Sequence, residues 1–231
     1  MINLSFTFIP VLVVIVILRS WKISQKTSVF AVLRMVTQLL LIGYLLTYIF
    51  QTDEASIVLG VLVVMVLSSS WIALRTVKIP RKDLFIKSFM AILVGGGAIL
   101  LLITQAVLQL KPWYLPSYMI PLAGMIFANA MNSVSLAGER LQAELNRGVS
   151  YDQAKIIALK AALIPITNSL FAVGLVSLPG MMTGQILSGV SPLIAVRYQI
   201  MVMCMTFGSA GITAALFINL VKPNITLADG D

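Results

Sequence analysis

The sequence predicts an all-α membrane protein, a bundle of about seven transmembrane helices with its N-terminus outside and its C-terminus in the cytoplasm. Hydrophobic residues make up 59% of the 231 residues, and charged residues make up only 10%. A soluble domain usually carries about 25% charged residues. One soluble core could not bury a chain with a mean hydropathy of +1.01, whereas a lipid bilayer accommodates it.

Seven apolar stretches are candidate spans, because a bilayer requires about 20 mostly apolar residues in each helix. They are residues 3–18, 35–50, 55–74, 84–109, 118–137, 162–179 and 192–221. The second helix is expected to begin earlier, near Thr27. In the fourth stretch, Gly95, Gly96 and Gly97 predict a kink or a close contact with another helix. We expect one transmembrane domain over residues 1–231.

The distribution of positive charge gives the bundle its orientation. With the N-terminus outside, 14 of the 16 Lys and Arg residues fall in cytoplasmic segments, and only Lys111 and Arg197 fall outside. Such a split follows the positive-inside rule. Arg19 and Lys22 follow the first apolar stretch rather than precede it, which favours a retained span over a signal peptide. We therefore expect a multi-pass protein of the inner (plasma) membrane, in contact with lipid.

Several function classes are excluded by what the sequence lacks. It contains no His and a single Cys, Cys204. The commonest general base and metal ligand is thus missing, and neither a disulfide framework nor a thiolate cluster can form. No GxxxxGK[ST] or GxGxxG motif occurs, so we expect neither an enzyme nor a chain that binds ATP or a cofactor itself. The net charge of +8 is attributed to the positive-inside bias, and no nucleic-acid partner is expected.

The longest polar segment, at about 138–160, is predicted to form a cytoplasmic helix–glycine–helix elbow. Two short helices, at 139–147 and 151–160, would meet at Gly148, which suits the left-handed position that closes a helix. Ser150 and Gln153 have the spacing of a capping box. The mixture of charged and apolar residues fits either docking of a partner protein or an ordinary connection at the lipid headgroups. The candidate docking residues are Glu139, Arg140, Glu144, Arg147 and Gly148.

Polar residues inside the fifth span form a candidate site. Asn129, Asn132 and Ser133 are three and four residues apart and share a helix face. Asn is unfavourable in hydrocarbon, so these side chains are expected to face other helices or a substrate path. Both interpretations stay open on the sequence alone.

Three further features have a structural and a functional interpretation. Arg34 and Gln38 share a face of the second helix, and Arg197 lies near the outer end of the last span; anchoring at the interface or packing is favoured for these. Met181 and Met182 belong to an uncharged segment, 179–192, expected to be a short outer helix or a re-entrant piece. Thioethers suit soft ions such as Cu(I), but methionine more often fills gaps in apolar packing, so metal ligands stay unassigned.

Four stretches of the chain resemble the FetB-type ABC transporter permeases, a family of bacterial iron-export and plant aluminium-tolerance permeases. They are RMVTQLLLIGY at 34–44, IPLAGMI at 120–126 with Asn129-Ala-Met131, VSLPGMMTG at 176–184 and RYQIMV at 197–202. The resemblance extends over about residues 28–205, in the same order. The run Ser-Leu-Pro-Gly-Met-Met is its most specific part.

This resemblance implies a permease that pairs with a separate ABC ATPase subunit, as two permease copies and two ATPase copies. ATP would act through that partner, and the elbow resembles the coupling segment of ABC permeases, although its spacing departs from the importer pattern. Export of iron or another metal ion by alternating access is implied, with a nucleotide sugar or a non-transporting scaffold or sensor as alternatives. The substrate path is expected at Asn129, Asn132, Ser133, Met181 and Met182.

Overall fold

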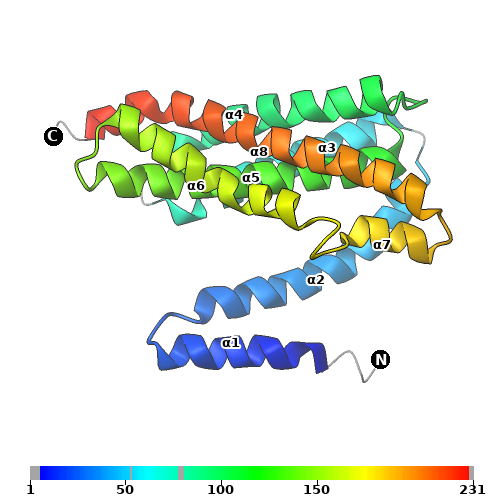
Figure 1. Ribbon diagram of the computed structural model, residues 1–231, viewed down its shortest axis with the longest axis horizontal. Helices are drawn as coiled ribbons and strands as arrows, with labels where there is room; N and C mark the ends of the chain where they lie inside the picture. Colours follow the sequence, from blue (N-terminus) through cyan, green and yellow to red (C-terminus); the bar gives the residue numbers. More distant parts are fainter. Residues whose placement is uncertain (1–5, 53, 78–80, 229–231) are drawn as a thin grey trace. The chain divides into compact units, whose positions relative to one another are not determined.

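The computed structural model describes residues 6–52, 54–77 and 81–228, and within these ranges it is helical and has no β-strand (Figure 1). The elements are α1 (Ile9–Ser20), α2 (Lys26–Ile49), α3 (Ala55–Ala73), a 3-10 turn (Leu74–Thr76), α4 (Arg81–Leu101), a π-helical turn (Leu102–Val107), α5 (Pro116–Leu145), α6 (Tyr151–Ala172), α7 (Gly180–Leu187) and α8 (Pro192–Ala228). Each of the seven predicted apolar stretches overlaps one of these helices, although residues 3–5 of the first lie outside the described residues and the sixth extends beyond the end of α6 at Ala172.

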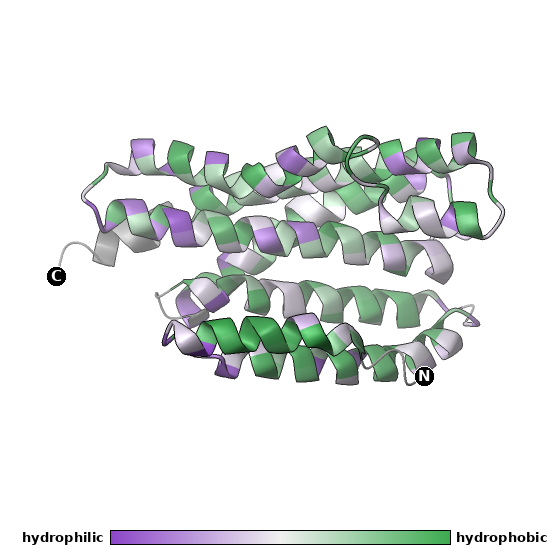
Figure 2. Ribbon diagram, turned by 60° about the horizontal axis from the view of Figure 1, so that its bottom comes forward, coloured by the Kyte–Doolittle hydropathy of each residue, from purple (hydrophilic) through white to green (hydrophobic). Residues whose placement is uncertain are grey.

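Six helices are long and apolar enough to cross a membrane, and α1 with the turn before it forms a shorter apolar helix, Phe6–Ser20. Figure 2 shows hydrophobic residues along the lengths of the helices and many of the hydrophilic residues near the helix ends. Helices satisfy their own backbone hydrogen bonds, as a chain in hydrocarbon must. The predicted polytopic helical bundle of about seven spans is confirmed.

The chain forms two compact units, one up to Asp53 and one from Glu54 onward. In the first unit, α1 and α2 are joined by a short turn in which Lys22 has a φ of 58°. The start of α2 at Lys26 confirms the helix start predicted near Thr27. No residue of α1 is buried, and most of the apolar side chains of α2 are exposed. Such helices require an apolar surrounding, which a bilayer supplies.

The second unit is organised around α8. This helix packs against α4, α5 and α6, while α3 packs against α4 and α5. Figure 1 shows α8, drawn in orange to red, running beside these helices for most of its length. The core where they meet contains Phe217 and Met205 from α8, Ile126 from α5 and Ile92 from α4, all nearly inaccessible to solvent.

Two of the three consecutive glycines allow α4 to approach its neighbours closely. A Cβ atom at Gly95 would lie 2.5 Å from Oγ1 and 3.0 Å from Cα of Thr213 on α8. A Cβ atom at Gly96 would lie 3.0 Å from the ring of Phe127 on α5, whereas at Gly97 it would meet nothing within 4 Å. The predicted close helix contact is therefore confirmed, and α4 continues as a helix through the glycines to Leu101.

The segment at 138–160 differs from the prediction of two separate short helices. α5 runs unbroken to Leu145 and α6 runs unbroken from Tyr151, so the predicted helices are the ends of two long ones. Gly138 lies inside α5 and is buried, and a Cβ atom there would lie 2.9 Å from Val77, so this glycine allows close packing and does not end the helix.

The turn between α5 and α6 closes at the predicted glycine. Gly148 has a φ of 81°, its N–H donates to the carbonyl of Leu145 at 2.8 Å, and the N–H of Val149 donates to the carbonyl of Glu144 at 3.1 Å. These two bonds are those of the Schellman motif, so the left-handed closure is confirmed. Ser150 does precede α6, but its side chain makes no capping hydrogen bond, so the predicted capping box is wrong.

The uncharged segment at 179–192 contains a short helix, α7, and whether it is an outer helix or a re-entrant piece stays a prediction. Gly174 and Gly189 flank it with φ values of 84° and 88°, where only glycine turns without strain. Gly174 lies in the loop between α6 and α7, and Gly189 lies in the turn after which α8 runs back along the bundle (Figure 1). α7 then packs against α8.

We predict that Gly95→Ala lowers the melting temperature of the detergent-solubilised protein by several degrees, because its methyl group would collide with the backbone of α8. Gly97→Ala is the matched control, since it adds the same methyl group in open space and replaces a poor helix former. The melting temperature is measured as the temperature at which heating halves the monodisperse gel-filtration peak. Equal melting temperatures for the two variants would contradict the close contact.

Candidate functional site

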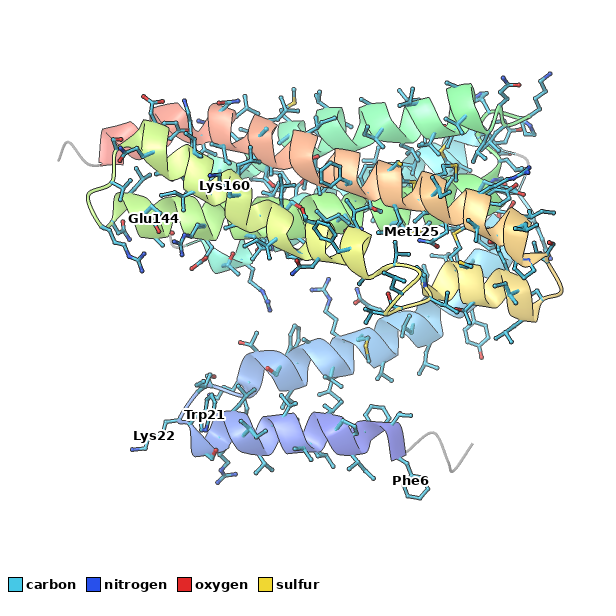
Figure 3. The ribbon with its side chains drawn as sticks, in the orientation of Figure 1. Phe6, Trp21, Lys22, Met125, Glu144 and Lys160 are labelled. Atoms are coloured by element: carbon cyan, nitrogen blue, oxygen red, sulfur yellow. The ribbon has the colours of Figure 1, made fainter. Side chains whose placement is uncertain are left out.

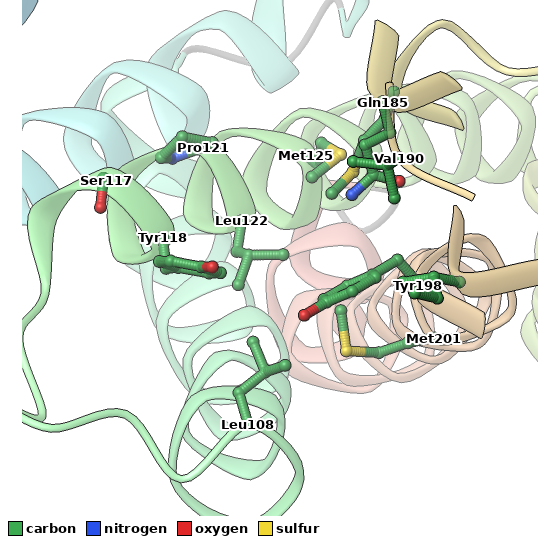
Figure 4. Close-up of a pocket in the computed structure, with 12 residues that line it drawn as sticks. Leu108, Ser117, Tyr118, Pro121, Leu122, Met125, Gln185, Val190, Tyr198 and Met201 are labelled. Carbon is green, nitrogen blue, oxygen red and sulfur yellow. The ribbon is translucent and has the colours of Figure 1, made fainter. Parts of the chain in front are cut away.

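A cavity of about 660 Å³ lies between α5, α7 and α8, near the end of the bundle where α7 turns into α8. Figure 4 shows Tyr118 and Leu122 of α5 turned toward the same space as Tyr198 and Met201 of α8. Gln185, from the short helix α7, lies on another side of this space. The cavity is thus built from helices that are far apart in the sequence.

The walls of the cavity are mostly apolar. Its polar side chains are Ser117, Tyr118, Gln185 and Tyr198, and among the described residues no Lys, Arg, Asp or Glu contributes to the lining. The Oε1 atom of Gln185 is buried and accepts no hydrogen bond within the described residues. A buried acceptor without a partner is unfavourable, but this oxygen is inaccessible from the cavity, so Gln185 lines the cavity with its other atoms.

Three methionines line the same cavity, Met125, Met181 and Met201. Of the residues predicted for a substrate path, Met181 is therefore placed at the cavity, whereas Met182 does not line it. Sequence reasoning missed Met125 and Gln185. The signal that could have found the glutamine is its spacing, because Gln185 follows Met181 by four residues and so shares its face of α7.

The other predicted path residues gather at a separate, smaller hollow of about 90 Å³ between α5 and α6. Asn129, Asn132 and Ser133 all line it, together with Ser169 of α6. The Asn129 amide donates to the backbone carbonyl of Met125 at 2.9 Å. Ser133 is buried and Asn132 is exposed. The two hollows share no lining residue, so the predicted path residues do not form one continuous site.

The end of α5 carries a cluster of charges around one carboxylate. Glu144 is only 5% exposed, and its Oε1 accepts from Arg140 at 2.7 Å and from Arg147 at 3.0 Å. The structure thus joins three of the predicted docking residues. A fourth, Glu139, forms no ion pair among the described residues and lines a hollow of about 310 Å³ beside Arg147.

The start of α6 is fixed to another helix. The hydroxyl group of Tyr151 donates to the backbone carbonyl of Ile218 on α8. On the exposed side of the same turn, Lys155 and Asp152 form an ion pair at 2.6 Å. The α5–α6 turn is therefore linked to the core of the bundle and not only to its own two helices.

The side chains that were predicted as anchors lie on helix surfaces. Arg34 and Gln38 are exposed on α2, and Arg197 is exposed on α8. None of them lines the cavities described above. Their anchoring role at the membrane interface stays a prediction.

Conventional ligands for a resident metal ion are not gathered in the described part of the chain. The sequence contains no His. Among the described residues, no three Cys, Asp or Glu side chains lie close enough together to hold an ion. The metal ligands that the sequence left unassigned stay unassigned.

Comparison with known proteins places the chain among membrane proteins. The model of a family described as "Uncharacterised protein family (UPF0014)" matches residues 1–225. The chain is 39% identical to the "Probable iron export permease protein FetB" of Escherichia coli over 93% of this chain and 88% of that protein. It is 35% identical to the UPF0014 membrane protein YjkA of Bacillus subtilis, over 96% and 94% of the two chains.

A plant relative is also similar over most of its length. The "Protein ALUMINUM SENSITIVE 3" of Arabidopsis thaliana is 30% identical over 97% of this chain and 86% of its own. No solved structure matches the chain. The similarity extends over both hollows and the charge cluster at the end of α5.

We predict that Glu144→Gln lowers the melting temperature, because Arg140 and Arg147 lose the charge that both contact. Glu139→Gln is the matched control, since this neighbouring carboxylate is exposed. Thermal unfolding of the two variants in the same detergent measures the difference, which should amount to several degrees. A loss of the same size in both variants would show that the buried carboxylate does not organise the end of α5.

Proposed function

The chain belongs to the UPF0014 family of membrane proteins, and from this premise we propose that it is the membrane-spanning subunit of an ABC-type exporter. A separate ABC ATPase, in two copies, would supply the energy, and a second copy of this chain would complete the unit in the inner (plasma) membrane. The observation that carries the proposal is the similarity, over 93% of the chain, to a relative named as a probable iron export permease.

The need for a partner follows from the sequence. No phosphate-binding loop occurs in the chain, so ATP would have to be hydrolysed elsewhere. The α5–α6 turn is the proposed docking place for the ATPase. It offers Arg147, whose side chain is 65% exposed, together with the exposed Asn146 and Gly148.

The same turn is suited to transmit a movement. α5 and α6 run without interruption from the turn into the bundle, so a push on their ends would displace both helices along their whole length. The Glu144 ion pairs hold the end of α5 together, and the Tyr151 hydrogen bond joins α6 to α8. Alternating access would then consist of the spans rocking around α5 and α6.

Iron or another metal ion is the proposed cargo. Fe²⁺ prefers nitrogen and oxygen ligands, and a transported ion must be bound weakly enough to leave. The hollow between α5 and α6 presents such groups, the amide of Asn132 and the hydroxyls of Ser133 and Ser169. A path of neutral oxygen atoms supports passage of an ion better than its permanent retention.

For the partner, we predict that the tagged chain, solubilised from its native membrane, captures an ABC ATPase in equal amount. Gly148→Val should reduce this capture severalfold, because valine is strained at a φ of 81° and would distort the turn. Gly180→Val is the control at a glycine without positive φ or nearby atoms. Mass spectrometry of the captured material measures the ratio. If the wild-type chain captures no ATPase, the proposal fails.

For the cargo, inside-out vesicles that contain the captured complex should take up radioactive Fe²⁺ when ATP is added. Asn132→Leu should reduce this uptake at least severalfold, since it removes an exposed amide from the α5–α6 hollow. Leu136→Val, in the same hollow, changes no polar group and serves as the control. ATP-driven uptake of labelled sugar nucleotides instead of iron would show that the cargo is a nucleotide sugar and not a metal ion. Uptake of neither substrate would favour a scaffold protein that transports nothing.

A further inference from the structure

The α1–α2 hairpin, which forms the unit up to Asp53, carries positive charge without a counter-charge of its own. Residues 6–52 contain no Asp or Glu and four basic residues, Arg19, Lys22, Lys26 and Arg34. All four basic side chains are exposed, and none forms an ion pair among the described residues. An anion that neutralises this charge would therefore come from outside the hairpin.

A groove of about 330 Å³ lies between α1 and α2. Residues between Phe8 and Ile15 form one wall, and residues between Val29 and Thr37 form the other. The lining is apolar except for Thr37, whose hydroxyl already donates to the backbone carbonyl of Leu33 at 3.0 Å. The two helices do not pack closely against one another. The groove thus offers apolar surface on two sides, which suits the methylene chain of a lipid.

Each wall of the groove ends in a basic residue. Arg19 follows Ile15 by four residues, and Lys26 precedes Val29 by three. Residues at these spacings share a helix face, so both cations lie on the groove side, one turn beyond the apolar lining. Lys22 lies in the turn that connects the two helices. The apolar groove therefore leads to a cluster of three cations.

A tryptophan indicates the depth of this cluster in the membrane. The side chain of Trp21 is 72% exposed, and Figure 3 shows it beside Lys22 at the turn between α1 and α2. Tryptophan is enriched where a bilayer meets water. The orientation predicted from the charges places the turn at the cytoplasmic face, where anionic lipids attract basic segments. The cations then lie at the level of the lipid phosphates.

We propose that the hairpin binds one anionic phospholipid, with its headgroup phosphate at Arg19, Lys22 and Lys26 and one acyl chain in the groove between α1 and α2. A free phosphate ion would match the cations but leave the groove empty. A neutral lipid would match the groove but leave the cations without a net counter-charge. An anionic lipid satisfies both, through charge-assisted hydrogen bonds at one end and apolar contact along the other. This binding does not rest on the proposed permease function.

The test is native mass spectrometry of the delipidated chain in detergent, titrated with phosphatidylglycerol or with phosphatidylcholine that has the same acyl chains. The first phosphatidylglycerol should bind at least fivefold more tightly than phosphatidylcholine. Arg19→Gln/Lys26→Gln should weaken the binding of phosphatidylglycerol tenfold or more, since one basic residue near a lipid headgroup contributes about fivefold. Arg75→Gln/Lys160→Gln is the matched control, because it removes the same charge from exposed positions outside the hairpin.

A second pair of variants examines the groove. Val11→Trp should fill the groove and weaken the binding of both lipids severalfold. Val13→Trp is its control, because Val13 is 53% exposed on α1 and does not line the groove. Monodisperse elution shows that each variant folds, and Val32→Trp blocks the groove from α2 if Val11→Trp does not fold.

Several results would overturn the inference. Equal affinity for the two lipids, or an equal loss in the two charge variants, would show that the cations at the turn select no headgroup. Equal binding by Val11→Trp and Val13→Trp would show that no acyl chain occupies the groove. Displacement of phosphatidylglycerol by glycerol 3-phosphate would identify a site for a free anion. Loss of a dimer in Val11→Trp with lipid binding intact would identify a contact between two copies of the chain. None of these outcomes depends on capture of the ATPase.

Discussion

A helical chain in hydrocarbon must satisfy its polar groups internally, because no water is available there, and this constraint explains most of the structure. The backbone does so by forming helices. Several buried hydroxyls do so by donating to carbonyls one turn earlier, as Ser70 does to Val66 at 2.7 Å and Thr206 does to Val202 at 2.8 Å. Such groups add no polar surface between helices, which can then pack closely through small residues such as Gly95.

Among the described residues the rule is relaxed at a few buried atoms, including those of Gln199 and Thr213 outside the candidate sites. Near the larger cavity, Gln185 has a buried oxygen without a partner among the described residues. Asn132 exposes an amide on the side of α5. Glu144 is buried as an acidic group, but at a helix end and between two arginines, where its charge is compensated. The α5–α6 hollow and the end of α5 are the places that we propose for passage and for coupling to the ATPase.

The sequence predicted the features that depend on local patterns. The spans follow from apolar stretches of sufficient length, and the closure at Gly148 follows from the conformational freedom of glycine. The unbroken course of α5 through Gly138 was missed because the polar composition after this residue was taken as the start of a separate helix, whereas in the structure Gly138 packs closely beside Val77. The cavity was missed as a whole, since only tertiary structure brings α7 beside α5 and α8. For the same reason Met181 and Asn132, predicted for one path, lie at different hollows.

The proposed coupling requires that the α5–α6 turn faces the cytoplasm, where an ATPase could reach it. Single cysteines in a Cys204→Ser background test this directly with a membrane-impermeant maleimide. Ser150→Cys, in the exposed turn, should react in inside-out vesicles but not in intact spheroplasts. Ser188→Cys, exposed after α7 at the other end of the bundle, should react in the opposite manner. Labelling of Ser150→Cys from outside the spheroplasts would contradict the orientation and the proposed coupling together.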